Sequence, residues 1–452
     1  MDLILENDGL NKKSEPRVLS VDDQLFKGFS KLTFDERLAY LKSNGYLNSE
    51  DVKFMKTGGL KDVALGEKFI ENTIGYFQLP IGVATNFVIN GKNYIIPMAV
   101  EETSIIAAAS KTARWVKENG RIETRVIGSE IIGQIQIAKV KDFDRLKKYI
   151  ETEETALVAK ANSDVAAGMV VRGGGVRSLK LRKLIRPDSL IMSVIHVQMD
   201  AVDAMGANIM NQVCEYLKTP IQENTDEVVT MCILSNLVDS KLTEARIVID
   251  KIDPELAEKI EEASLFAQLD PYRASTNNKG VMNGIDPILI ATGNDWRAVE
   301  AGVHSYASQN GLNGNYGSIT KWFREGTSLV GVLKAPIIVG TVGGVTNLHP
   351  MSQMSLKILG FPNANLLSQI TASVGLVQNL GALKALTTVG IIEGHMRLHA
   401  KNLALGAGAE EAEIPYVQKK LEEILTIKKR ITLSHAIEVL KELREQIQSK
   451  SN

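Results

Sequence analysis

Residues 122–236 alternate between strand-like and helix-like patterns in an order that few folds accommodate. We expect strands at 131–140, 169–171, 176–184, 190–199 and 228–234, and helices at about 142–161 and 206–217. An order of strand, helix, two strands, helix and strand, with extra strands, is typical of a ferredoxin-like α/β unit. Because the flanking sequence has a different rhythm, the pattern predicts that this unit is inserted into a larger domain.

The flanking sequence predicts mixed helices and strands. Thr33 and Glu36 have the spacing of a capping box, which begins a helix. The Asn90-Gly91 pair lies within alternating apolar residues and favours a β-hairpin with a tight turn. A long apolar helix is expected at about 365–388. At 452 residues the chain exceeds the size at which one core usually keeps growing, so several domains are expected.

The C-terminal residues predict a separate small unit. Glycines at 406 and 408 break the chain before two charged amphipathic helices, 415–425 and 433–448, which favour a hinged helical cap. The expected fold class is therefore α+β. It comprises a large mixed helical/β domain of residues 1–121 and 237–390, an inserted ferredoxin-like α/β domain of residues 122–236, and a helical C-terminal flap of residues 391–452.

The charge balance favours a small-molecule partner. With 52 basic and 53 acidic residues and a pI of about 6.6, no net field attracts nucleic acid or an anionic membrane. Cys214 and Cys232 lack the spacing of a zinc site and are interpreted as buried thiols. The acidic N-terminus lacks a signal-peptide pattern, and the apolar stretch 328–345 is interrupted by Lys334 and Pro336. We expect a cytoplasmic protein with no nucleic-acid or membrane partner.

Lys279 and Asp295 stand on either side of an apolar element that begins with an amide-bearing turn at Asn283. Such spacing can return both charged groups to one site. A lysine ammonium held near a carboxylate stays protonated, which suits a reaction in which negative charge grows on a carbonyl oxygen.

Glu101 and Glu102 follow directly on a predicted buried strand. Adjacent glutamates are most often a solvated edge. Here the apolar setting favours one carboxyl facing inward as a proton donor, and only one can do so because strand residues alternate between faces.

Asp203 and Gly206 lie between a predicted strand and a predicted helix. Free N–H groups and the dipole at such a helix start can hold a phosphate. The alternative is an ordinary aspartate cap with a close-packing glycine. The glycines at 173–175 lack the dinucleotide fingerprint spacing and suggest only a turn or bulge.

His395 and His399 lie one helical turn apart and could share a metal, although no third ligand is evident. A histidine just ahead of a hinged cap fits better as a proton donor to a leaving group.

Several motifs together resemble the hydroxymethylglutaryl-coenzyme A reductases. They are Glu-Asn-x-Ile-Gly at 71–75, Met-Ala-Val-Glu-Glu-x-Ser at 98–104, Asp-Ala-Met-Gly-Ala-Asn at 203–208, Gly-Asn-Asp at 293–295 and Gly-His-Met at 394–396. The resemblance runs from about Glu71 to the C-terminus. The Lys-Gly-Val-Met-Asn-Gly-Ile segment at 279–285, the short C-terminal cap and the lack of a membrane anchor look like the soluble prokaryotic class, class II.

The resemblance implies a four-electron reduction of the substrate thioester to mevalonate and free coenzyme A by two nicotinamide hydrides. It implies catalytic roles for Glu102, Lys279, Asp295 and His395. In these roles Lys279 stabilises the oxyanion, Asp295 orients the lysine and His395 protonates the leaving thiolate. It further implies that the acyl group is bound by Ser104, Arg273 and Asn283.

The resemblance also places the dinucleotide, NADPH or NADH, on Asp203, Met205, Gly206 and Asn208 within the inserted domain. Asp164 lies near the position where an acidic residue favours NADH. Three nearby basic residues could instead accept the phosphate of NADPH, namely Lys160, Arg172 and Arg177. The choice between the two cofactors stays open.

The family forms its active sites between two subunits, so a homodimer or an assembly of dimers is implied, with the large domain binding substrate and forming the dimer. Two other functions remain as alternatives. A metal-dependent acyl-thioester hydrolase would use His395 and His399. A non-catalytic regulator that binds coenzyme A or a nucleotide would have no need for Lys279, Asp295 and Glu102 together.

Overall fold

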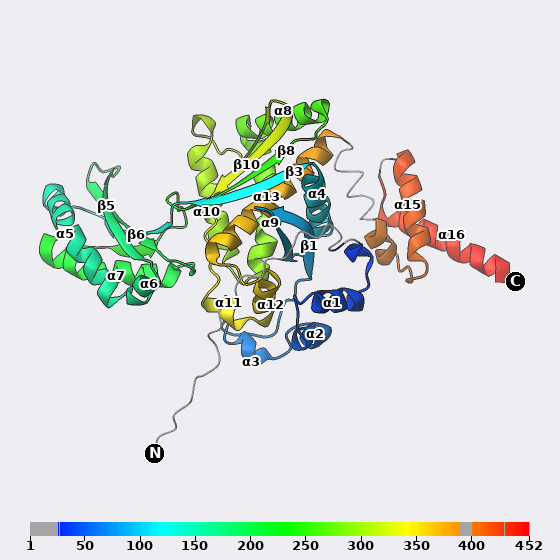
Figure 1. Ribbon diagram of the computed structural model, residues 1–452, viewed down its shortest axis with the longest axis horizontal. Coiled ribbons are helices and arrows are strands. Elements are labelled where there is room, and N and C mark those ends of the chain that lie inside the picture. The colour runs from blue at the N-terminus through cyan, green and yellow to red at the C-terminus, as the bar shows by residue number, and fades with distance from the viewer. Residues whose placement is uncertain (1–25, 27, 389–399, 429, 452) are drawn as a thin grey trace, which may run out of the picture.

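The computed structural model describes residues 26, 28–388, 400–428 and 430–451. Figure 1 shows three parts along the long axis of the molecule: a small α/β unit on one side, a large mixed domain in the centre and a pair of helices on the other side. The expected α+β class is confirmed by this mixture of helices and sheets.

A six-stranded sheet forms the centre of the large domain. Its strands are β1 (Ile81–Ile89), β2 (Lys92–Ala99), β3 (Gly120–Ile127), β8 (Leu242–Ile249), β9 (Thr320–Glu325) and β10 (Ser328–Ala335), in the order β2-β1-β3-β8-β10-β9. Neighbours run antiparallel except β1 and β3. The predicted hairpin is confirmed, because Asn90 and Gly91 have φ of 49° and 75° and join β1 to β2.

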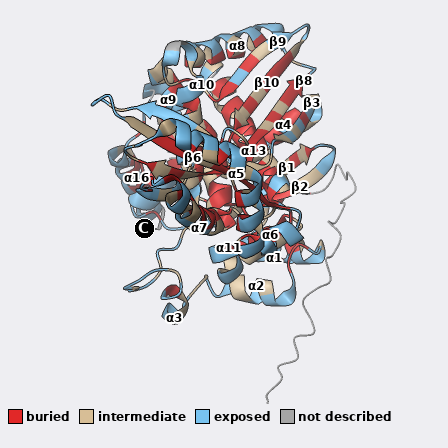
Figure 2. Ribbon diagram, turned by 90° about the vertical axis from the view of Figure 1, so that its left-hand side faces the viewer, coloured by how far each residue is buried: buried red, intermediate tan, exposed pale blue. Residues whose placement is uncertain are grey.

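Helices cover one face of this sheet. They are α4 (Ile105–Asn119), α8 (Pro254–Leu269), α9 (Pro271–Ala291) and α13 (Ala364–Thr387). Figure 2 shows buried residues concentrated along the sheet and α13. Among the described residues, α13 alone is long and apolar enough to cross a membrane, and 78% of its apolar window is buried, as in the core helix of a globular domain. The buried Trp322 indole N–H donates to Asn379 on α13 at 2.8 Å.

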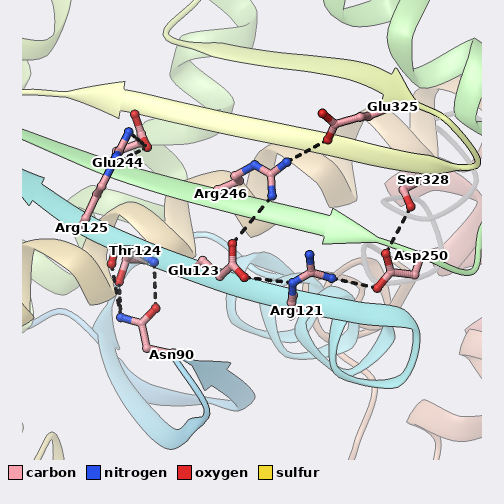
Figure 3. Close-up of polar contacts among 10 residues, drawn as sticks. All are labelled: Asn90, Arg121, Glu123, Thr124, Arg125, Glu244, Arg246, Asp250, Glu325 and Ser328. Atoms are coloured by element: carbon pink, nitrogen blue, oxygen red, sulfur yellow. Dashed lines mark hydrogen bonds and ion pairs between the residues drawn. The ribbon is translucent and has the colours of Figure 1, made fainter.

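The opposite face of the sheet carries charged side chains that pair across strands (Figure 3). Arg246 lies 3.0 Å from Glu325 and 3.7 Å from Glu123, and Arg125 lies 2.7 Å from Glu244. Each such exposed pair stabilises the fold only weakly. Buried apolar side chains alternate with these charges along β8, so one face packs against helices and the other is polar.

The inserted unit has the predicted ferredoxin-like topology. Its elements are β4 (Glu130–Ile137), α5 (Phe143–Asp164), α6 (Ala167–Val171), β5 (Gly175–Ile185), β6 (Ile191–Asp200), α7 (Ala207–Thr225) and β7 (Met231–Leu234). The sheet order is β5-β6-β4-β7, with every neighbour antiparallel. The helices and the inner sheet face share a separate apolar core.

Two details of the inserted unit differ from the prediction. Residues 169–171 belong to the short helix α6 and not to a strand, because Met169 packs into the domain core beside α5. The predicted boundary at residue 122 falls within β3, which pairs with β8 along its whole length in the large sheet. The chain enters the small sheet only at Glu130 and returns to the large one at Leu242.

Short helices complete the lower side of the large domain in Figure 1: α1 (Phe34–Ser43), α2 (Ser49–Lys56), α3 (Val63–Gly66), α11 (Gly344–Leu348) and α12 (Pro350–Ile358). The predicted capping box is confirmed, since Thr33 accepts from the Glu36 N–H and Glu36 accepts from the Thr33 N–H. Lys357 on α12 forms a 2.6 Å ion pair with Asp51 on α2.

The C-terminal part contains a helical turn at 400–406 followed by α15 (Ile414–Lys428) and α16 (Leu433–Ser451). These segments enclose their own apolar core, in which Val417, Leu421 and Ala436 are fully buried. The two predicted amphipathic helices are therefore present.

The remaining helix of the large domain, α10 (Trp296–Asn310), follows α9 closely, and single 3₁₀ turns lie at Phe29–Lys31 and Leu312–Gly314.

Candidate active site

Glu102 and Lys279 lie close together in the large domain. The Lys279 Nζ lies 3.6 Å from Glu102 Oε2, with the two side chains 64% and 43% exposed. Glu102 belongs to the bend between β2 and α4, and Lys279 lies in the middle of α9. Segments far apart in the sequence thus place a carboxylate beside an ammonium.

The expected inward-facing glutamate is not found in the single chain. Glu101 and Glu102 are both exposed, because β2 ends at Ala99 and the strand alternation no longer applies to them. Ser104 follows in a left-handed conformation with φ of 78°, and its side chain does not cap α4. The hydroxyl of Ser104 therefore stays available near Glu102 at the start of the helix.

Helix α9 carries the other predicted acyl-binding residues. Asn283 lies one turn after Lys279, so both side chains project from the same face of the helix. Arg273 lies near the helix start, about 9 Å before Lys279 along the axis and on a different side. Burial lowers the pKa of the Arg273 guanidinium, which forms no ion pair within the described part of the chain.

Asp295 does not return to Lys279 within one chain. The predicted turn at Asn283 is wrong, since residues 271–291 form the single helix α9. Gly284 continues the helix because it lets α13 approach: a Cβ there would lie 2.7 Å from the Val374 carbonyl oxygen. From residue 279 to residue 291 the helix rises by about 18 Å. Asp295 then caps α10, accepting from the Ala298 N–H at 3.1 Å.

Asp295 lies instead beside the segment 203–208. The neighbouring Asn294 side chain accepts from the Gly340 N–H at 2.8 Å. A Cβ on Gly340 would lie only 2.5 Å from the Met205 nitrogen, so the two backbones touch. Met205 and Ala298 line the same small hollow between the inserted unit and the large domain. Lys279 therefore lies in the middle of α9, whereas the C-terminal end of the helix leads toward the segment predicted to bind the dinucleotide.

The segment 203–208 forms the entry to α7. Gly206 is the N-cap residue with φ of 88°, and no side chain caps the helix. A Cβ on Gly206 would lie 2.5 Å from the Ile131 side chain, so the glycine is required for this close packing. Asp203 accepts from the Ala364 N–H at 3.0 Å and its carbonyl from the Thr341 N–H at 2.9 Å. These bonds join the inserted unit to the large domain, and the first turn of α7 keeps its N–H groups for a ligand.

Asp164 ends α5 and is already engaged. Hydrogen bonds from the Ser163 and Tyr216 hydroxyls lower the pKa of the Asp164 carboxyl, which is therefore ionised. Arg172 and Arg177 flank the glycine turn at 173–175 and are exposed. The Arg177 guanidinium donates to the Gly173 carbonyl at 2.6 Å.

The two histidines of the C-terminal motif, His395 and His399, lie outside the described residues. Within the described part of the chain, no three histidine, cysteine or acidic side chains are grouped as metal ligands would be.

Three residues near the predicted site were missed by the sequence reasoning. Gly340 packs against the Met205 backbone, Asn294 accepts from the Gly340 N–H, and burial lowers the pKa of Lys241 while Asp200 and Asp203 partly offset that shift; none of the three belongs to a motif that was singled out. For Lys241 a usable signal existed: a lysine directly ahead of the apolar strand β8.

A pair of half-buried carboxyl groups joins α9 to α10. Asp286 is two turns beyond Lys279 on the same helix, and burial together with Glu300 on α10 raises the pKa of Asp286 to about 8. The carboxyl of Asp286 is therefore protonated at neutral pH.

Comparisons with known proteins agree with the motifs. Residues 33–400 match the family model described as hydroxymethylglutaryl-coenzyme A reductase. The 3-hydroxy-3-methylglutaryl-coenzyme A reductase of Archaeoglobus fulgidus is 42% identical over 425 residues, covering 92% of this chain and 94% of the relative. A probable reductase of the same name from Borreliella burgdorferi is 36% identical, covering 74% and 77%.

Solved structures give the same result. A 3-hydroxy-3-methylglutaryl-coenzyme A reductase from Streptococcus pneumoniae superposes with a TM-score of 0.77 at 38% identity, covering 92% of this chain and 99% of its own. A structure of the class II reductase from the same organism, bound to NADPH in open conformations, superposes with a TM-score of 0.76 at 37% identity, covering 80% of this chain and 100% of its own.

Proposed function

The chain belongs to the hydroxymethylglutaryl-coenzyme A reductase family, and we infer that it works as a nicotinamide-dependent oxidoreductase of class II. It reduces the thioester of hydroxymethylglutaryl-coenzyme A to mevalonate and releases coenzyme A. NADPH or NADH supplies one hydride in each of two successive reductions. This family assignment favours the reductase over the metal-dependent acyl-thioester hydrolase and over a non-catalytic binding protein.

The observation that carries the catalytic assignment is the approach of Lys279 to Glu102 at 3.6 Å. Each reduction places negative charge on the substrate oxygen, and an ammonium fixed at that point stabilises the charge as it forms. The carboxylate of Glu102 favours the charged form of the lysine. We assign Lys279 to stabilising the oxyanion. We assign Glu102 to transferring a proton together with Lys279.

Asp295 completes the site from a second copy of the chain. Because α9 rises by about 18 Å from residue 279 to its end at residue 291, and Asp295 lies beyond that end, one chain offers two half-sites. One half holds Glu102, Ser104 and Lys279, and the other holds Asp295 and the segment 203–208. Two copies related by a twofold axis bring unlike halves together twice. A homodimer, or an assembly of such dimers, is therefore the proposed active form.

Exposed apolar residues support the dimer. Ile74 and Phe77 in the segment before β1 are 102% and 92% exposed, and Leu269 and Tyr272 at the start of α9 are 62% and 87% exposed. Large apolar side chains are rarely left so open in a monomer, and a second copy covering them would also shield the exposed Glu102–Lys279 pair from water.

The substrate acyl group is assigned to α9 and the start of α4. Asn283 shares the helix face of Lys279 and offers an amide close to the reacting carbonyl. Ser104 offers a hydroxyl beside Glu102. The half-buried guanidinium of Arg273, with no counter-ion among the described residues, suits the free carboxylate of the hydroxymethylglutaryl group.

We assign protonation of the leaving group to His395. After the first reduction the carbon–sulfur bond breaks, and the coenzyme A thiolate takes a proton from the imidazolium. Residues 391–452 would then act as the flap that closes over this step.

The inserted domain fits a dinucleotide. The uncapped first turn of α7 offers N–H groups and the positive end of a helix dipole to the pyrophosphate. Asp203, Met205, Gly206 and Asn208 form this entry. Because Tyr216 and Ser163 occupy the Asp164 carboxylate, while Arg172 and Arg177 are exposed nearby, the phosphate-bearing NADPH is not opposed at this end. A cytoplasmic location, without membrane or nucleic-acid partners, completes the proposal.

The test follows the absorbance of reduced nicotinamide with hydroxymethylglutaryl-coenzyme A, run separately with NADH and NADPH. Lys279→Ala should abolish turnover while thioester binding stays measurable, because only transition-state stabilisation is lost. Lys321→Ala, which removes an exposed lysine on β9, serves as the matched control and should keep normal turnover. Near-normal turnover in Lys279→Ala would refute the catalytic assignment, and thioester hydrolysis without oxidation of the nicotinamide would refute the reductase.

A further inference from the structure

Asn278, which directly precedes Lys279 on α9, is fully buried and fully hydrogen-bonded. Its Nδ2 donates to the Tyr316 hydroxyl and to the Gly317 carbonyl, each at 2.9 Å, and its Oδ1 accepts from the Ile319 N–H at 3.1 Å. Because a backbone N–H only donates and a backbone carbonyl only accepts, these contacts fix which end of the amide faces which partner. A single orientation of the side chain therefore satisfies all of these partners.

Asn277 holds the same helix from another side. Its Oδ1 accepts from Asn379 on α13 at 2.8 Å, and its Nδ2 donates to Ser318 at 2.8 Å and to Thr320 at 3.1 Å. Asn277 and Asn379 are both buried. A buried amide that loses its partner is costly, so a small rotation or slide of α9 would break several hydrogen bonds at once. The two neighbouring asparagines therefore hold α9 in one rotation and one register.

Tyr316 connects this helix to α10. Its hydroxyl lies 2.7 Å from Nδ1 of His304 on α10. Burial raises the pKa of the Tyr316 phenol, so the hydroxyl keeps its proton at neutral pH. Because this hydroxyl accepts from Asn278 and has one proton, it donates that proton to Nδ1 of a neutral His304. Asp295 is the N-cap residue of α10, so one phenol connects the helix that carries Lys279 to the helix that Asp295 caps.

The placement of the Lys279 ammonium depends on how α9 is held. The Lys279 side chain is 64% exposed and its ammonium lies 3.6 Å from Glu102, so this exposed ion pair constrains it only weakly. A rotation of α9 by about 10° would move an atom about 5–6 Å from the helix axis by about 1 Å. A misplacement of about 1 Å can lower an enzymatic rate by about a hundredfold. The hydrogen bonds of the two preceding asparagines therefore bear directly on the reaction.

We propose that Tyr316 is a positioning residue, which acts through Asn278 and His304 to hold Lys279 in its place beside Glu102. The inference rests on the proposed function for the catalytic role of Lys279. It adds to the site a loop, residues 315–319, that no sequence motif indicated. Tyr316 is assigned no contact of its own with substrate or cofactor.

Tyr316→Phe removes the hydroxyl and keeps the ring. Because Lys279 stabilises the oxyanion in both reductions, kcat should fall roughly tenfold to a hundredfold for the thioester and for mevaldehyde alike. The KM values for both substrates and for NADPH should change by less than about twofold, since only transition-state stabilisation is lost. Each variant is assayed well below its own Tm, so that loss of folded protein does not affect kcat.

Tyr149→Phe is the matched control. The Tyr149 hydroxyl also makes a hydrogen bond, to the Pro220 carbonyl at 3.2 Å, but it lies in the inserted unit at the opposite end of α7 from Gly206. Its removal should leave kcat normal. An equal fall of kcat in Tyr149→Phe would show that any lost phenol hydrogen bond has this effect and would overturn the proposal.

His304 offers a conservative rescue and a double-mutant cycle. His304→Asn keeps an acceptor near the position of Nδ1 and should keep most of kcat, whereas His304→Ala removes the acceptor and should lower kcat. Adding His304→Ala to Tyr316→Phe should cause little further loss, because both changes break the same hydrogen bond. A general loosening of the fold would instead multiply the two losses and would lower kcat in His304→Asn as well.

A crystal structure of Tyr316→Phe gives a readout that needs no turnover. The Lys279 Nζ should lie about 1 Å or more from its wild-type position. An unchanged position of Lys279, a normal kcat in Tyr316→Phe, a rise in KM without a fall in kcat, or multiplied losses in the double variant would each overturn the proposal. Near-normal turnover in Lys279→Ala would refute the proposed function instead, and the crystal structure would still report whether Tyr316 positions the lysine.

Discussion

Mixed dimers of two inactive variants test whether the half-sites come from different copies. Lys279→Ala damages the half at the middle of α9, and Asp295→Ala damages the half beyond its end. In a dimer containing one copy of each, one site receives both damaged halves and the other receives both intact halves. Each variant alone should be nearly inactive, because every site of its homodimer lacks one group.

The expected recovery follows from the geometry. With equal amounts of the two variants associating at random, half of the dimers are mixed and each has one working site of two, so about one quarter of wild-type activity should return. If all groups came from one chain, no combination would restore a site. The separation of about 18 Å along α9 excludes direct contact between Lys279 and Asp295 in one chain.

The assay co-expresses the two variants with different affinity tags and follows oxidation of reduced nicotinamide in the pooled protein. Glu102→Ala combined with Lys279→Ala is the matched control, because both groups belong to the same half and no intact site can form. Retention of each tag on the other's resin verifies that the copies associate. Activity of the first pair no higher than that of the control pair, despite association, would refute the two-copy site.

Three further outcomes are expected. Because the folded pKa of Asp286 is raised to about 8, folding takes up a proton between pH 4 and 8, and stability falls as pH rises through that range. Denaturant unfolding of wild type should show this loss, up to about 1.4 kcal/mol per pH unit, and Asp286→Asn should flatten it; parallel profiles would contradict the raised pKa. His395→Gln should lose thioester reduction but keep most mevaldehyde reduction, since no thiolate leaves in that step, and equal losses in the two assays would exclude the leaving-group role. Gly340→Ala should raise the KM for the dinucleotide several-fold and leave the KM for the thioester nearly unchanged, because the added Cβ displaces Met205; a change in the thioester KM alone would contradict this placement.

Local signals in the sequence predicted local structure well. The capping box at Thr33, the Asn90-Gly91 hairpin and the strand and helix order of the inserted domain depend on neighbouring residues and on simple periodicity, and all are present. The resemblance assigned catalytic roles to Lys279 and Glu102, but nothing local to either residue predicts that the two side chains approach each other.

The failures have a common cause in tertiary packing. Asn283-Gly284 looks like a turn, but the missing side chain of Gly284 serves the close approach of α13 and the helix continues. That continuation separates Lys279 from Asp295. Residues 169–171 have a strand-like composition, but they form α6, in which Met169 packs into the core of the inserted unit. Lys241 was missed because its burial depends on two linkers that meet only in the folded protein.

The self-contained core of the C-terminal helices bears on how substrate gains access. Val417, Leu421 and Ala436 are enclosed by α15, α16 and the helical turn before them, with no contribution from the large sheet. If this segment moved as a rigid body, those side chains would remain buried. Under the proposed flap role, admission of a coenzyme A thioester requires no partial unfolding of this segment. Substitutions that loosen its core should then change kcat before they lower the Tm of the large domain.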